Sequence, residues 1–185
     1  MEDDKPRVTP RAMPPPVKPG VKIACANLFT AEQLAVQVGR EVEIRDVSTN
    51  EADATSICRL MTVGKPPSES AQARMEKRGE GILGVLPGDE LCQVTFYCWW
   101  HVDEAELTAK CKAAGDTPNS DVGDVGCIRA VQAGEKFRHQ VTAIDPDTRC
   151  RVVANGGPSV TDLETVKTCA RAALTSVGPS QIKVE

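Results

Sequence analysis

The chain has 185 residues and a formal net charge of −4, with 41% hydrophobic and 26% charged residues. These values are typical of one soluble globular domain. The scattered Lys and Arg exclude a basic surface for nucleic acid or acidic lipid, and no apolar run is long enough to span a bilayer. Aromatic residues make up only 3% of the chain, so we expect an aliphatic core that needs a second source of stability.

The N-terminal segment, residues 1–20, is rich in proline and has no periodic apolar pattern. It predicts an extended tether of polyproline II type, and a disordered tail without a role is the alternative. Three acidic residues follow Met1, which is not the pattern of a secretory signal. The chain is then either cytoplasmic or the mature form of a processed precursor, and its cysteine content favours the second. We expect the folded domain to occupy residues 21–185.

The first predicted elements are a helix and two strands. Thr30 and Gln33 form a capping-box pattern that predicts a helix start, and Gly39 ends that helix. Residues 41–47 alternate between polar and apolar side chains, which predicts a half-buried strand. Residues 55–63 predict a second strand.

Residues 68–82 predict a helix with a solvated face. The strongest strand signal follows at residues 91–102, which contain most of the aromatic residues of the chain. Asp103 begins the next predicted helix, which Gly115 ends.

The aromatic strand has two faces because strand side chains alternate. We expect Val94, Phe96, Cys98 and Trp100 on one face and Gln93, Thr95, Tyr97, Trp99 and His101 on the other. Either a helix covers the second face, or the second face is open. In the open case Tyr97, Trp99 and His101 would form a binding surface for a ligand or partner.

The second half of the chain begins with a predicted polar loop at residues 116–126 and a short strand at 127–131. Residues 137–144 and 149–154 predict a hairpin around the turn Asp145–Thr148. A second turn at 155–158 precedes a final helix that starts at Thr161 or Asp162 and carries one apolar stripe. The hairpin requires antiparallel pairing, so the predicted fold is α+β, a single domain with a twisted antiparallel sheet flanked by helices.

Eight cysteines are a high and even number for this length. No two of them form a C-x-x-C pair, which argues against zinc ribbons, thioredoxin-type motifs and most iron–sulfur sites. Their wide spacing favours a disulfide framework formed in an oxidising compartment, and buried free thiols are the alternative. The eight are Cys25, Cys58, Cys92, Cys98, Cys111, Cys127, Cys150 and Cys169.

Spacing alone cannot choose among the 105 possible connectivities. A Cys25–Cys58 bridge would fix the start of the first helix to the second strand, so we predict this pair first. The predicted order of elements then favours three further pairs, which are Cys98–Cys111, Cys150–Cys169 and Cys92–Cys127.

Residues with catalytic or metal-binding chemistry are few. His101 lies beside Asp103, but that carboxylate is needed as a helix cap, and His139 is expected to be partly buried. The glycines between residues 79 and 88 lack the Lys-Ser/Thr of a phosphate loop. The aspartates near residue 145 are better explained by a turn than by calcium. We therefore predict no catalytic, metal or cofactor site.

Cys25-Ala-Asn-Leu-Phe-Thr-Ala-Glu-Gln-Leu, followed by Gly39 and Cys58, resembles the opening of small actinobacterial lipoproteins. Val122-Gly123-Asp124 and the final Ala-rich helix are similar in outline to the extracellular sensor domains of bacterial Ser/Thr kinases and to PsbP-like domains. The resemblance implies an antiparallel sheet flanked by helices, a second cysteine paired to the first, and a ligand- or protein-binding role.

Together these features predict an extracytoplasmic, non-catalytic binding or scaffold protein, located in the periplasm or outer envelope or secreted. Its partner would be an envelope or extracellular protein or a small ligand. Membrane contact is expected only through an N-terminal lipid on a precursor. Two alternatives stay open: a secreted enzyme or enzyme inhibitor with a loop site, and a cytoplasmic protein with reduced cysteines.

Overall fold

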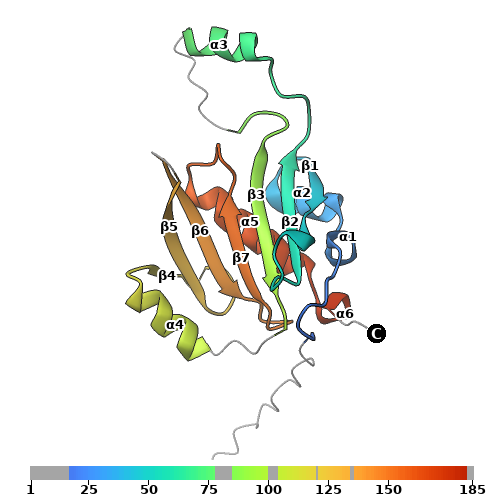
Figure 1. Cartoon of the computed structure of the whole chain (residues 1–185), viewed down its shortest axis with the longest axis vertical. Coiled ribbons are helices and arrows are strands. Elements are labelled where there is room, and N and C mark those ends of the chain that lie inside the picture. Colours follow the sequence, from blue (N-terminus) through green and yellow to red (C-terminus); the bar gives the residue numbers. More distant parts are fainter. Residues whose placement is uncertain (1–16, 78–84, 100–103, 120, 134–135, 183–185) are drawn as a thin grey trace, which may run out of the picture.

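A computed structural model of the chain describes residues 17–77, 85–99, 104–119, 121–133 and 136–182. These residues form one seven-stranded antiparallel sheet with helices on both sides, so the predicted α+β class is confirmed (Figure 1). Along the sheet the strands lie in the order β1-β2-β3-β7-β6-β5-β4. None of the described helices is both long and apolar enough to cross a bilayer.

The strands are β1 (Val42–Asp46), β2 (Ser56–Thr62), β3 (Glu90–Tyr97), β4 (Thr117–Asn119), β5 (Gly126–Ala133), β6 (Lys136–Ile144) and β7 (Arg151–Gly156). The helices are α1 (Cys25–Leu28), α2 (Ala31–Val38), α3 (Glu69–Lys77), α4 (Glu104–Ala113), α5 (Leu163–Ser176) and α6 (Pro179–Ile182), with a 3-10 turn η1 (Ser48–Asn50) between β1 and β2.

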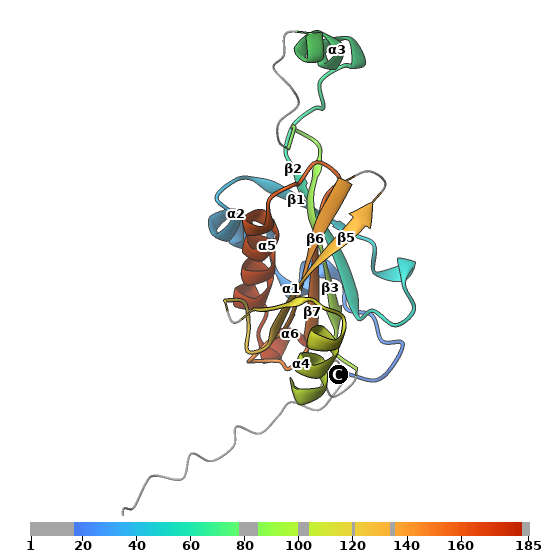
Figure 2. The same ribbon diagram turned by 90° about the vertical axis from the view of Figure 1, so that its left-hand side faces the viewer.

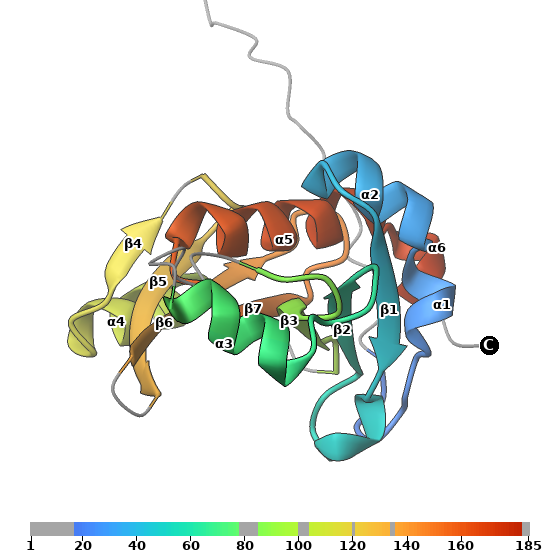
Figure 3. The same cartoon turned by 90° about the horizontal axis from the view of Figure 1, so that it is seen from above.

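The core lies between the sheet and the layer formed by α2 and α5, on one side of the sheet (Figures 2 and 3). Val94 and Phe96 of β3 are fully buried there, and Leu34 of α2 and Val166 of α5 pack into the same cluster. Alternation in β3 and the apolar stripe of α5 produce this layer, because each presents one apolar face.

The predicted boundaries of α2 and the predicted start of α5 are confirmed. The Thr30 side chain accepts a hydrogen bond from the Gln33 backbone, and Gln33 returns one to Thr30. Gly39 ends α2 with φ of 80°, a left-handed conformation that favours glycine. Asp162 is the residue that caps α5.

Other boundaries differ from the expectation. The loop expected at 116–126 contains β4, which pairs with β5, and Asn155 and Gly156 belong to β7 rather than to a turn. The aromatic strand ends at Tyr97, and Trp100, His101 and Asp103 lie outside the described residues.

The segment expected to be a tether enters the folded domain before residue 21. Val17 is buried against the core, and its backbone N–H donates to the carbonyl oxygen of Cys98 at 3.1 Å. Residues 1–16 lie outside the described part of the chain.

All eight cysteines are paired, as predicted, and Cys25–Cys58 is one of the pairs. The other three predicted pairs, Cys98–Cys111, Cys150–Cys169 and Cys92–Cys127, are wrong. The structure joins Cys92 to Cys169, Cys98 to Cys150, and Cys111 to Cys127.

The order of the strands explains these differences. Cys150 directly precedes β7, and β7 lies beside β3, so Cys150 meets Cys98 at a Cα–Cα distance of 4.4 Å. The buried stripe of α5 places Cys169 over Cys92 in the middle of the sheet. The sequence predicts that the helix after β3 packs against the core side of β3, and this is wrong. It lies on the opposite face of the sheet, where Cys111 reaches Cys127 of β5.

Candidate functional site: the open face of the sheet

The side of the sheet opposite α2 and α5 carries polar side chains from several neighbouring strands, and we call it the open face. Helix α4 lies over this face at its β5 end, where the Cys111–Cys127 disulfide holds it (Figure 3). Many side chains in the middle of this face are half-buried. A ligand that lies on them would therefore contact preformed strands.

A continuous row of polar side chains crosses the open face. Each member is the direct cross-strand neighbour of the next, and neighbours of this kind project from the same face. We call these residues the polar row: Arg45 (β1), Arg59 (β2), Gln93 (β3), Asn155 (β7), Gln140 (β6) and Arg129 (β5).

Hydrogen bonds orient the side chains of the polar row. Arg59 Nε donates to the Gln93 side-chain oxygen at 3.1 Å, and the Gln140 amide donates to the Asn155 side-chain oxygen at 2.8 Å. Among the described residues, no acceptor lies within hydrogen-bond distance of the NH₂ groups of Gln93 and Asn155. The Gln140 side-chain oxygen likewise receives no hydrogen bond from a described residue. The centre of the row therefore offers both donors and acceptors to a ligand.

Two concave regions of the open face share the polar row as lining. A cavity of about 500 Å³ is lined by Arg59, Glu90, Gln93, Val131, Arg138, Asn155, Gly156 and Pro158. A second cavity, of about 260 Å³, lies beneath α4 and includes Arg129, Gln140, Thr142, Arg151 and Val153. Side chains from β2 to β5 thus line adjoining hollows, and most of these side chains are polar.

The arginines of this region differ in their partners. Arg59 lies 3.5 Å from the Glu90 carboxylate, and Arg129 forms an ion pair with Asp116 at 2.9 Å. Arg138 is half-buried in the larger cavity, and its side chain forms no hydrogen bond or ion pair with any residue that the structure describes. The Arg138 guanidinium therefore lines a cavity without a carboxylate beside it among the described residues, which suits it to an incoming anion.

Tyr97 and Arg151 form a stacked pair at the α4 end of the open face. The Arg151 guanidinium carbon lies 4.4 Å from the centroid of the Tyr97 ring, a cation–π geometry. The Tyr97 hydroxyl donates to Glu51 at 2.7 Å. Burial, and next the hydrogen bond to Glu51, raise the pKa of Tyr97 far above its usual range, while burial lowers the pKa of Arg151.

The predicted binding residues are thus only partly available as an aromatic surface. Tyr97 is half-buried under Arg151, and Trp99 is partly buried with its indole N–H donating to the Asp53 carbonyl oxygen at 2.6 Å. Both are contacted by the β1–β2 connection, whose residues include Glu51 and Asp53. His101 lies outside the described residues. A binding role for these three residues stays a prediction.

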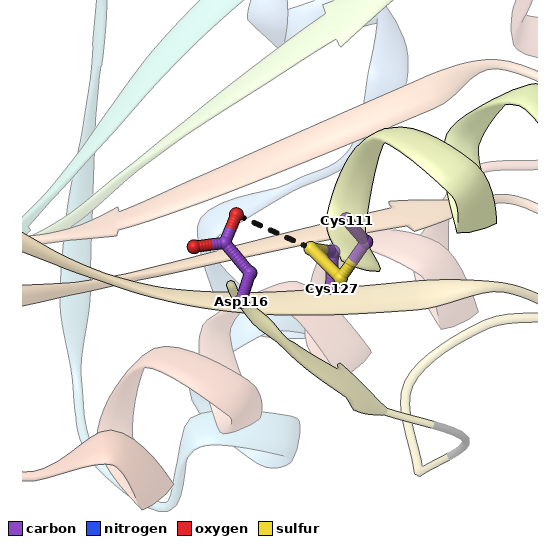
Figure 4. Close-up of side chains that lie close together, drawn as sticks. All are labelled: Cys111, Asp116 and Cys127. Atoms are coloured by element: carbon purple, nitrogen blue, oxygen red, sulfur yellow. Dashed lines mark hydrogen bonds between the residues drawn. A yellow bond between two sulfur atoms is a disulfide. The ribbon is translucent and has the colours of Figure 1, made fainter. Parts of the chain in front are cut away.

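Cys111, Asp116 and Cys127 lie together at the base of α4, with their ligand-type atoms within 4.8 Å of one another (Figure 4). Thiolates would suit a metal, but these two sulfurs are bonded to each other. The 3.6 Å approach of the Cys127 sulfur to Asp116 is a packing contact, because a disulfide sulfur has no proton to donate. The cluster's role in this structure is to fix α4 over the smaller cavity.

The aspartates near residue 145 form a turn, as the sequence predicts. The buried Asp145 carboxylate accepts from the Thr148 hydroxyl at 2.7 Å and from the Asp147 backbone at 3.0 Å. Burial raises the pKa of Asp145 despite these hydrogen bonds. Asp124 forms an ion pair with Arg149 at 3.0 Å. His139 is partly buried, which also agrees with the prediction.

The polar row was missed at the level of sequence. Its members occupy polar positions in alternating strands, so each could have been assigned to a solvated face. Their alignment across six strands depends on the register of five strand pairs, which no single segment of the sequence contains.

Comparison of the chain with models of protein families, with curated proteins and with solved structures found no match. A function for this chain is therefore inferred from the open face and its polar row.

Proposed function

We propose that this chain is a non-catalytic binding protein of an oxidising, extracytoplasmic compartment, and that its ligand lies on the open face. The main support for this proposal is the polar row. Its central amides have hydrogen-bonding groups without partners among the described residues. Gln93, Asn155 and Gln140 are only partly exposed, and strands fix their positions, so a polar ligand that replaces the water on them would find its hydrogen-bonding groups already in place.

The chemistry of the polar row supports binding rather than catalysis. It consists of arginines and carboxamides. Arginine stays protonated near neutral pH and carboxamides do not titrate, so these groups hold and orient a ligand but are poor acids and bases.

Four disulfides support the proposed compartment, because such bonds form and persist in oxidising environments. The protein unfolded without reductant should contain no titratable thiol, and reduction should add two hydrogens per disulfide to its mass. Eight free thiols in protein isolated from its own cells would instead support a reducing compartment. An anchor lipid on the precursor is a further proposal, which the precursor sequence would test.

The binding proposal can be tested by nuclear magnetic resonance, with the side-chain amides as reporters. A panel of neutral and charged sugars, amino acids and short peptides is first screened by thermal shift. A hit should then move the side-chain NH₂ signals of Gln93, Asn155 and Gln140. The double variant Gln93→Ala/Asn155→Ala should fold but lose most of the thermal shift. Ligands that bind equally well to this variant would contradict the proposed surface.

A further inference from the structure

We infer that the ligand of the open face is an acidic oligosaccharide, lying across the strands along the polar row. This inference rests on the proposed binding function and adds the class of ligand. It follows from the length of the row, its charge, its amide groups and the surroundings of Arg138.

The polar row is long, and each of its members is the direct cross-strand partner of the next. It runs across six strands in sheet order, from β1 to β5. Adjacent strands lie about 4.8 Å apart, so the row is roughly 24 Å long. The strand backbones are hydrogen-bonded to one another across it, so side chains rather than backbone groups would meet the ligand. A linear ligand fits this shape better than a compact one.

The charge of the row favours an anion although the chain as a whole is acidic. The row contains three arginines and no acid, and Arg138 adds a fourth cation beside it. Among the described residues, Glu90 pairs with Arg59 and Asp116 pairs with Arg129. Arg45 and Arg59 are direct cross-strand neighbours, an arrangement of like charges that is unfavourable and that a bound anion would relieve.

The centre of the row favours hydroxyl groups. Gln93, Asn155 and Gln140 present NH₂ donors and a carbonyl acceptor side by side, and a hydroxyl is the group that both donates and accepts. A ligand with many hydroxyls between its carboxylates is an acidic sugar chain.

Other linear anions fit less well. An acidic peptide would pair with the arginines as well, but its carboxylate side chains do not supply hydroxyl groups to the amides at the centre of the row. Single-stranded nucleic acid needs exposed aromatic rings for base stacking, but the Tyr97 ring already stacks on Arg151.

The test compares three probes of similar length by isothermal titration: an oligogalacturonate, a neutral malto-oligosaccharide and an oligoglutamate. We expect the oligogalacturonate to bind most tightly, at least tenfold better than the neutral sugar, and to weaken as salt rises. Arg138→Ala should reduce its affinity about tenfold, and Asn155→Ala several-fold. Arg74→Ala, which removes an exposed arginine on α3, is the matched control and should change nothing.

Circular dichroism and the melting temperature of each variant show whether it has folded. Equal binding of the neutral sugar to the open face would overturn the inference but leave the proposed binding function intact. Tighter binding of the oligoglutamate would also overturn the inference, leave the proposed binding function intact and point to an acidic peptide as the ligand. The inference would also be overturned if Arg138→Ala and Arg74→Ala reduced the affinity for the oligogalacturonate equally. If none of the three probes binds, the inference fails, and the wider ligand panel then decides the proposed function separately.

Discussion

At the scale of single residues, Asp162 shows how one side chain fixes the start of an element. Its carboxylate accepts hydrogen bonds from the Thr165 backbone at 2.9 Å and the Thr165 hydroxyl at 2.7 Å. These bonds lower the pKa of Asp162 below its ordinary value of 3.8. The ionised carboxylate therefore caps α5, the helix that covers the core.

We expect Asp162→Ala to reduce the free energy of unfolding by about 1 kcal/mol at pH 7, the usual value of such a cap. Since the folded pKa is lowered, the contribution of Asp162 is present above pH 3.8 and is lost as the pH falls through the folded pKa. Urea unfolding at pH 7 and pH 3 would measure both effects. Asp162→Asn keeps an acceptor without the titration, so its stability should depend less on pH. Equal pH dependence in wild type and Asp162→Asn would contradict the assignment.

At the scale of elements, the disulfides differ in what they constrain. Cys111–Cys127 joins residues only 16 apart and holds α4 on the open face, whereas Cys92–Cys169 joins residues 77 apart and crosses the core. In the chain-entropy model these bridges stabilise by roughly 3 and 4.5 kcal/mol respectively.

We therefore expect the double variant Cys92→Ala/Cys169→Ala to lose more stability than Cys111→Ala/Cys127→Ala. The second variant should also lose hydrogen-exchange protection in α4 while α5 keeps its protection. Guanidinium unfolding and hydrogen exchange read by mass spectrometry measure the two effects. Loss of protection throughout the sheet in the second variant would show that α4 supports the whole fold.

The elements also show how far sequence reasoning reaches. The capping box at Thr30 and the hairpin around Asp145 are local patterns, and both are confirmed. The pairing of Cys98 with Cys150 depends on β7 lying beside β3, and the alignment of Asn155 with Gln93 depends on the register of that same pair. Neither relation is local, because strand order is settled by packing of the whole sheet. The resemblance to envelope lipoproteins stays a prediction.

At the scale of the whole molecule, the folded domain begins no later than Val17, because this residue is buried and its backbone N–H bonds to Cys98. We expect a chain starting at residue 17 to melt within a degree or two of the full chain. A chain starting at residue 22 should be less stable by about 1–2 kcal/mol, since it loses a buried valine and a backbone hydrogen bond. Thermal unfolding of both forms checks this. Equal stability would show that Val17 adds nothing.

The disulfides also divide the molecule into two covalent sections. Cys25–Cys58 closes the first, while Cys92–Cys169 encloses Cys98–Cys150, which encloses Cys111–Cys127. No bridge links residues up to Cys58 with residues from Cys92 onward. A peptide bond cut between these two cysteines therefore leaves halves that only non-covalent forces hold together.

Helix α3 lies in that linking segment and exposes Arg74 and Lys77, two targets for trypsin. After brief digestion, we expect the nicked protein to elute as one species under native conditions, because β2 and β3 stay paired. On a denaturing gel without reductant the same material should split into two bands. A cut between Cys92 and Cys169 should split it only after reduction. A single band from the α3 cut would reveal a bridge between the sections. The fold thus consists of two covalently closed sections that only non-covalent contacts join, chiefly the pairing of β2 with β3 and the packing of α2 on α5.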